Sequence, residues 1–152
     1  RPKPRRGRAP AHSRRAPRQV SDRALRIAVG GLAALGVAIA AYLAYTRYTE
    51  TTIACTTGGC EVVQRSEYAE LFGIPVVVLG LGAYVFLLGT ALFTIELARL
   101  SGAVTAVSGA LFAGYLLVAQ LFLIDAVCQW CVASDVVIAL LAVACVLRLR
   151  PA

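Results

Sequence analysis

The chain has 152 residues, of which 59% are hydrophobic and only 15% are charged. Soluble domains are closer to half apolar and a quarter charged, so the composition argues against an ordinary soluble enzyme and against disorder in most of the chain. Ten of the 15 Lys and Arg residues lie within the first 26 positions. This distribution is typical of a small integral membrane protein with a basic tail.

The basic tail comprises residues 1–22, which are rich in Arg, Pro and Ala. We expect this segment to be disordered and to contact anionic membrane lipid. Aromatic side chains that stack on bases are a common feature of nucleic-acid-binding segments, and this segment has none. The sequence therefore favours membrane lipid over nucleic acid as its partner.

Residues 23–150 contain four apolar stretches, each close to the roughly 20 residues that a helix needs to cross a bilayer. The stretches are residues 24–46, 74–95, 103–124 and 126–147. We therefore expect an all-α integral membrane protein, a bundle of four transmembrane helices with a long extracytoplasmic loop between the first and second. The first stretch exceeds the roughly 7–15 apolar residues of a cleaved signal peptide, so we expect it to remain as an anchor.

The distribution of Lys and Arg predicts the orientation of the four helices. These residues are concentrated in the tail, in the connection at 96–102 and at the C-terminal end, whereas the opposite side holds only Arg47 and Arg65. Because positive charge is retained on the cytoplasmic side, both termini should be cytoplasmic. We expect a multi-pass protein of the cell inner (plasma) membrane, with the loop at 47–73 facing outward.

Four of the five cysteines fall on the predicted outer side, in two pairs. Cys55 and Cys60 lie in the long loop (the loop pair), and Cys128 and Cys131 open the fourth stretch (the helix pair). Disulfides persist in an oxidising compartment outside the cytoplasm. The fifth, Cys145, lies about 25 Å deeper along the same helix and is expected to be a small buried apolar residue.

The spacing of the helix pair indicates redox chemistry. Residues at i and i+3 share one helix face, and the unpaired N–H groups of a first helical turn favour a thiolate. A disulfide of the loop pair closes too short a loop to restrict the unfolded chain much, which argues against a purely structural role. Two dithiols at a membrane surface predict a two-electron relay between a soluble thiol protein and a lipid-soluble quinone.

Three other classes of function remain open at this point. A zinc site would need four thiolates in an oxidising compartment, because the only histidine, His12, lies on the opposite side. A metal-ion transporter of the mercury-uptake type would need a cytoplasmic exit pair, and only Cys145 lies toward that side. A structural membrane protein held by two disulfides is the third possibility. We expect no bound metal.

The two cysteine pairs occur together with a wider pattern. Residues 66–75 are Ser-Glu-Tyr-Ala-Glu-Leu-Phe-Gly-Ile-Pro, and Gly80 and Tyr84 follow in the second stretch. This set resembles the Ser, Gly-x-Pro and Gly-xxx-Tyr pattern of the vitamin K epoxide reductase family, and the resemblance covers residues 24–147. The unrelated disulfide bond formation protein B usually has its quinone-side pair in the first outer loop, so the order of the pairs here differs.

The resemblance implies roles for the four cysteines. Cys55 would exchange with a reduced thioredoxin-like protein, and Cys60 would pass the electrons to Cys128. Cys131 would face the quinone, either menaquinone or ubiquinone. Many bacterial relatives carry a fused thioredoxin-like domain, whereas this chain ends at Ala152, so the partner is expected to act in trans.

Two positions depart from the vertebrate pattern. Those members have an Asn directly after the position of Pro75, where this chain has Val76, and a Tyr at the position of Asp135. Both positions are linked to substrate oxygens in the family, so plain quinone reduction is expected here. Asp135 lies one turn from Cys131 and is predicted either to relay a proton or bind the quinone oxygen, or to be a hydrated or helix-linking Asp.

Three further residues are candidates for supporting the site. Ser66 is expected to hold the loop, and Tyr84 to bond a quinone oxygen if it faces the pocket. Trp130 would either anchor at the membrane interface or stack on the quinone. The stretch at 60–72 predicts a short amphipathic helix on the bilayer surface that could cap the quinone pocket.

Overall fold

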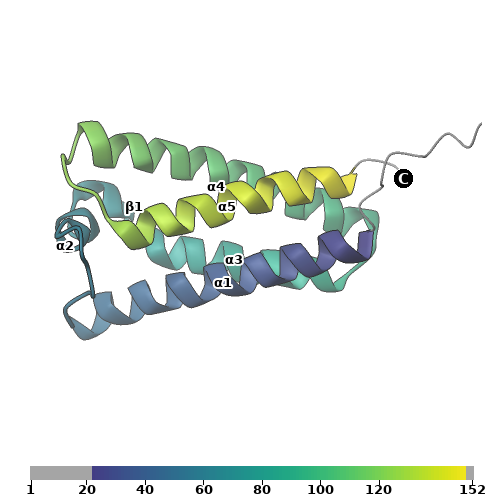
Figure 1. Ribbon diagram of the computed structural model, residues 1–152, viewed down its shortest axis with the longest axis horizontal. Coiled ribbons are helices and arrows are strands. Elements are labelled where there is room, and N and C mark those ends of the chain that lie inside the picture. The colour runs from purple at the N-terminus through teal and green to yellow at the C-terminus, as the bar shows by residue number, and fades with distance from the viewer. Residues whose placement is uncertain (1–21, 150–152) are drawn as a thin grey trace, which may run out of the picture.

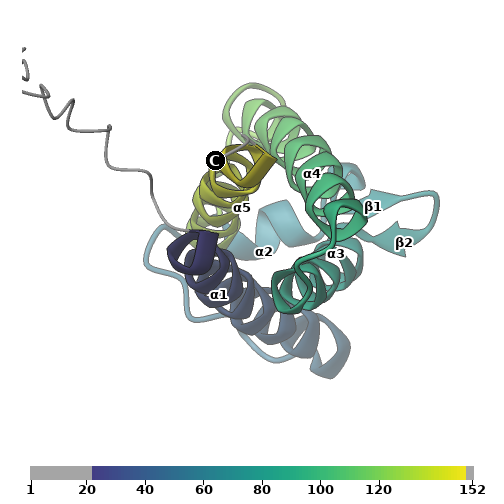
Figure 2. The same ribbon diagram turned by 90° about the vertical axis from the view of Figure 1, so that its right-hand side faces the viewer.

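The computed structural model describes residues 22–149, and within them the dominant elements are four long helices that lie side by side (Figure 1). The end-on view shows them arranged around a common centre (Figure 2). Helix α1 packs against α3 and α5, and α4 packs against the same two helices. The four helices are α1 (Asp22–Thr49), α3 (Val76–Leu92), α4 (Glu96–Phe122) and α5 (Gln129–Leu149).

The connection between α1 and α3 carries several short elements at one end of the bundle (Figure 1). It contains helix α2 (Cys60–Gln64), a single 3-10 turn η1 (Glu67–Ala69) and strands β1 (Glu70–Leu71) and β2 (Ile74–Pro75). The strands are antiparallel, with Glu70 opposite Pro75 and Leu71 opposite Ile74. The amphipathic helix expected at 60–72 is therefore wrong beyond its first turn. The positive φ angles of Phe72 (53°) and Gly73 (80°) turn the chain into a hairpin instead.

The apolar helices agree with the expected membrane protein. Within residues 22–149, α1, α4 and α5 are long and apolar enough to cross a membrane, whereas α3 has 17 residues. Large apolar side chains such as Leu92 and Leu111 are 71% and 73% exposed on the outside of the bundle. Such an exterior suits lipid and would be unusual on a water-soluble monomer.

All four helices have boundaries that differ from the expected stretches, most of all at the start of α4. The segment at 96–102 was expected to connect two helices, but it forms the first turns of α4. Helix α5 begins at Gln129 and not at residue 126. The expected tail lies outside the described residues apart from Asp22, which begins α1.

Small residues allow the helices to approach closely in the core. A Cβ atom on Gly36 would lie 2.3 Å from the ring of Tyr84, so α1 and α3 meet at this glycine. A Cβ atom on Gly102 would lie 2.9 Å from the hydroxyl of Thr90. Close backbone approach through small residues is a common basis of helix packing in membranes.

Charged side chains tie the helices together at the end opposite α2. Arg26 donates to the carbonyls of Ala91 and Leu92 at 3.0 and 3.1 Å, which satisfies acceptors that the end of α3 leaves free. Asp22 pairs with Arg99 at 3.3 Å and with Arg148 at 3.7 Å. These contacts fix the helix ends on that side, whereas both cysteine pairs lie at the opposite end of the bundle, beside α2.

Candidate functional site

The loop pair forms a disulfide in this structure, with an S–S distance of 2.10 Å. Cys55 lies in the irregular segment before α2 and is partly exposed, whereas Cys60 is the first residue of α2 and is completely buried. The two sulfurs therefore differ in access. A soluble thiol protein can approach Cys55, while Cys60 faces the interior.

The helix pair consists of free thiols. Cys128 immediately precedes α5 and is completely buried, and Cys131 lies in the first turn. The amide of Cys131 donates to Sγ of Cys128 at 3.3 Å. Hydrogen bonds from the Cys131 thiol and from the Cys131 and Trp130 amides lower the pKa of Cys128 to about 7, although burial and the charge of Asp135 oppose this. The lowered pKa favours the thiolate form of Cys128.

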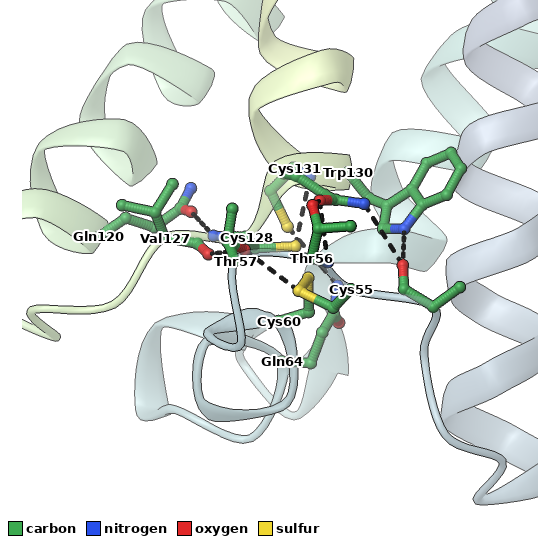
Figure 3. The surroundings of a disulfide bond; sticks show 12 residues. Cys55, Thr56, Thr57, Cys60, Gln64, Gln120, Val127, Cys128, Trp130 and Cys131 are labelled. Atoms are coloured by element: carbon green, nitrogen blue, oxygen red, sulfur yellow. Dashed lines mark hydrogen bonds between the residues drawn. A yellow bond between two sulfur atoms is a disulfide. The ribbon is translucent and has the colours of Figure 1, made fainter.

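The two pairs meet in one buried cluster. Cys60, Val63 and Cys128 form its centre, and Cys55 and Cys131 pack at its edge. Figure 3 shows the disulfide directly beneath the start of α5. The completely buried member of each pair thus lies against the completely buried member of the other, which excludes water from the space between them.

Hydrogen bonds hold the loop pair against the start of α5. Thr57 donates through its hydroxyl to the carbonyl of Val127 at 2.8 Å. The hydroxyl of Thr56 donates to the side-chain oxygen of Gln129 at 2.5 Å (Figure 3). Gly59 packs on the same backbone, since a Cβ atom there would lie 2.7 Å from the oxygen of Val127 and 2.8 Å from its nitrogen. The loop is therefore docked on the helix pair.

Trp130 belongs to this docking contact. Its indole N–H donates to the carbonyl of Ala54 at 2.7 Å, and its ring lies 5.0 Å from that of Tyr42. The hydroxyl of Tyr42 in turn accepts from the amide of Ala54. Trp130 points toward the loop and does not line the cavity described next.

A cavity of about 530 Å³ opens beside Cys131. Residues of α1, α2, α3, α4 and α5 and of the hairpin line it, and its walls are mainly apolar. This volume lies within the usual range of small-molecule sites. The cavity therefore places one sulfur of the helix pair at the edge of a space that is suited to an apolar ligand.

The cavity walls include several polar groups, and one of them contacts Cys131 directly. Gln64 donates through its side-chain amide to Sγ of Cys131 at 3.6 Å. The hydroxyl of Tyr84 donates to the Ser134 carbonyl and lies 2.8 Å from the Ser134 hydroxyl. Oδ2 of Asp135 is buried and has no hydrogen-bond partner within residues 22–149. These groups can orient a ligand that carries oxygen atoms.

The remaining predicted residues either line the cavity or lie apart from it. Ser66 and Val76 line the cavity, and the Ser66 hydroxyl donates to the carbonyl of Val63 at 2.7 Å, which fixes the end of α2. Pro75 ends β2 directly before α3. Cys145 lies in the main core with 3% of its surface exposed, apart from both pairs.

The match to a known family covers nearly the whole membrane domain. A model of the vitamin K epoxide reductase family matches residues 27–146. The chain belongs to this family. Members of the vitamin K epoxide reductase family are membrane thiol-disulfide oxidoreductases, act on quinones and generally work with thioredoxin-like partners. The predicted family is therefore confirmed, and with it an oxidoreductase of the membrane.

Two residues of this vitamin K epoxide reductase homologue were missed at the level of sequence. Gln120 on α4 is 2% exposed and accepts from the amide of Cys128 at 2.9 Å, which holds the helix pair in place. Gln64 contacts Cys131 from α2. A signal existed for Gln120, because a polar amide inside an apolar stretch is costly unless it has a partner.

Metal binding finds no support in the described part of this family member. Within residues 22–149, His, Cys, Asp and Glu form no group of three or more that could hold a metal ion. The loop pair is also joined as a disulfide, which removes two thiolates from any such site.

Proposed function

We propose that this protein takes electrons from a thioredoxin-like protein and passes them through Cys55 and Cys60 to Cys128 and Cys131, and then to a quinone. The process supports disulfide formation outside the cytoplasm. The observation that carries the proposal is the single buried cluster in which Cys60 lies against Cys128, while Cys131 borders the apolar cavity.

The first transfer is a thiol-disulfide exchange with the partner. The dithiol of the partner reduces the Cys55–Cys60 disulfide and becomes a disulfide itself, so that two electrons enter the loop pair. The partial exposure of Cys55 supports it as the sulfur that is attacked.

The second transfer takes place inside the buried cluster. The Cys60 thiolate attacks Cys128 of an oxidised helix pair, a Cys60–Cys128 bond forms, and Cys131 leaves as a thiolate. Cys55 then attacks Cys60, which restores the loop disulfide and frees Cys128. The structure, with a loop disulfide and free helix thiols, corresponds to the stage after this transfer.

The third transfer reduces the quinone. The helix pair forms a disulfide and gives up two electrons and two protons, which convert the quinone to the quinol. Cys131 and Asp135 both line the cavity and lie one helical turn apart. The unpartnered Oδ2 of Asp135 supports a role in moving a proton to the quinone oxygen, and Tyr84 and Ser134 provide hydroxyl groups nearby.

Plain quinone reduction fits the walls of the cavity better than epoxide reduction. Val76 lines the cavity with an apolar side chain where vertebrate members have an Asn, and Asp135 replaces a Tyr. Menaquinone and ubiquinone are both suitable substrates. Trp130 supports the site through the loop, since its indole holds Ala54.

We further propose that the protein lies in the cell inner (plasma) membrane. All four long helices would span this membrane, and both termini would be cytoplasmic. Helix α3 rises about 25 Å over its 17 residues. A bilayer accommodates a helix a few ångströms shorter than its hydrocarbon core at modest cost. The concentration of Lys and Arg in the tail and at the C-terminal end supports the orientation.

The proposal is tested by measuring quinone reduction by the purified protein with a reduced thioredoxin-like donor. We expect the native protein to be active and Cys131→Ala to be inactive. Cys55→Ala should fail with the protein donor but accept electrons from a small dithiol. A native protein that reduces no quinone, with both pairs unreactive toward the donor, would leave a structural role for the disulfides.

A further inference from the structure

The short helix α2 contacts both sulfurs of the helix pair. Cys60 and Gln64 are its first and last residues, and side chains four residues apart share one helix face. Cys60 packs against Cys128, and the amide of Gln64 donates to Sγ of Cys131 at 3.6 Å. One turn of helix therefore spans the whole pair, as the labelled side chains in Figure 3 illustrate.

We infer that Gln64 is a catalytic residue for exchange between the two pairs, because its amide stabilises the Cys131 thiolate that leaves when Cys60 attacks Cys128. The inference rests on the proposed function and adds a residue to it. In the exchange, the Cys60–Cys128 bond forms, the Cys128–Cys131 bond breaks, and its electron pair stays on Cys131. Helix α2 thus carries both the attacking sulfur of Cys60 and the amide of Gln64 that donates a hydrogen bond to the leaving sulfur.

The chemistry of the leaving group explains why an amide is useful here. A thiol leaves faster when its thiolate is better stabilised, and a donated hydrogen bond stabilises the charged form. The carboxyl of Asp135 borders the same cavity and would repel a thiolate when it is ionised. Gln64 is neutral at every pH, so it offers a donor without adding a charge that titrates.

The position of Gln64 is fixed by contacts outside α2. Arg47 at the end of α1 donates to the Gln64 carbonyl, and the same guanidinium pairs with Glu70 on β1 at 2.5 Å. The Ser66 hydroxyl donates to the carbonyl of Val63. These donors satisfy carbonyls that the end of a helix leaves free. Arg47 is therefore a positioning residue that acts through Gln64.

The test isolates the exchange step in a Cys55→Ala background. In this variant Cys60 can attack Cys128, but the resulting bond cannot be resolved by Cys55. The protein is held at low pH with the helix pair oxidised and Cys60 reduced, then brought to pH 8. The Cys60–Cys128 bond is counted by acid quenching, alkylation and mass spectrometry.

Two substitutions of Gln64 separate an electrostatic role from a structural one. Gln64→Met keeps the length of the side chain and removes the donor, and we expect exchange about tenfold slower. Gln64→Glu keeps the shape but places a carboxylate beside the leaving sulfur, and it should be slower than Gln64→Met. If Gln64 only filled space, Gln64→Glu would retain the native rate. Val62→Ala, on the exposed side of the same helix, is the control and should change the rate less than twofold.

Arg47 is tested by a double-mutant cycle. Arg47→Leu should slow exchange when Gln64 is present and have little further effect when Gln64 is replaced by Met. Equal effects in both backgrounds would remove the positioning role. If Gln64→Met and Gln64→Glu both exchange at the native rate, the inference about Gln64 fails. If the Cys55→Ala parent forms no Cys60–Cys128 bond at all, the proposed relay itself fails.

The pH dependence gives an independent readout. The titratable groups around Cys131 are Cys128 and Asp135 on its own segment, Cys55 and Cys60 of the loop pair, and Tyr84 from α3 and Tyr68 from η1, which line the same cavity. The midpoint of the rate profile reports the attacking Cys60 thiol, so loss of the amide in Gln64→Met should lower the plateau rate at high pH and leave the midpoint unchanged. A shifted midpoint with the plateau rate of the parent would contradict stabilisation of the leaving thiolate.

Discussion

Replacement of Gly59 by Ala should separate the two cysteine pairs without touching a sulfur atom. The φ angle of Gly59 is −91°, which Ala adopts without strain, so the effect must come from the added methyl group. That carbon would lie 2.7 Å from the Val127 oxygen and 2.8 Å from its nitrogen. Ordinary contacts begin near 3.4 Å, so the loop must move away by about 0.7 Å.

The displacement acts on the step between the pairs. The neighbouring residue Cys60 moves with Gly59, and the Thr57 hydroxyl bond to Val127 weakens. Misplacement by about 1 Å costs a reaction on the order of a hundredfold in rate, so we expect exchange 10- to 100-fold slower. Reduction of quinone by a helix pair that is already reduced should change less than threefold, because neither Gly59 nor Val127 lines the cavity.

The assay compares these two half-reactions in Gly59→Ala and in a matched control. Gly58→Ala is the control, because Gly58 has a φ of 74° and no atom lies within 4 Å of an added Cβ. It introduces backbone strain of about 1 kcal/mol without a clash. The reasoning is refuted if Gly59→Ala exchanges at the native rate, or if Gly58→Ala slows exchange equally.

Three further predictions concern the groups around the sulfurs. The pKa of Cys128 is lowered to about 7. The difference in absorbance at 240 nm between the native protein and Cys128→Ser should therefore rise with pH, with a midpoint near pH 7. A midpoint near 9 would contradict the hydrogen-bonded thiolate. Asp135→Asn should lower quinone turnover at least tenfold and change its pH profile; unchanged turnover at every pH would remove the proton role. Tyr84→Phe should destabilise the folded protein by about 1 kcal/mol, measured by denaturant unfolding in detergent, because Ser134 loses a hydrogen-bond partner; a variant as stable as the native protein would show that this contact contributes nothing.

The sequence predicted the helices well because membrane-spanning helices have a strong hydropathy signal. All four apolar stretches lie mainly within long helices. The boundary near residue 96 was missed because Glu96 and Arg99 resemble a polar connection, although both are good helix formers and extend α4. Hydropathy marks the apolar part of a helix and not its end.

The site was predicted less completely than the fold. Cysteine spacing identified both pairs, and Asp135 followed from its position one turn beyond Cys131. Contacts between elements could not be predicted, because the link between Gln64 and Cys131 depends on how α2 docks across the bundle. Likewise, the hydrogen bond from Trp130 to Ala54 joins α5 to a distant loop, and the residue pattern of α5 alone does not predict it.

The order of oxidation is the measurement that tests the relay most directly. The fully reduced protein is mixed with one equivalent of quinone, quenched with acid at increasing times and mapped by mass spectrometry. We predict that the Cys128–Cys131 disulfide forms first and that the Cys55–Cys60 disulfide follows as electrons redistribute. A Cys55–Cys60 disulfide that forms first, or quinone consumption at the earliest times without any Cys128–Cys131 disulfide, would contradict the account.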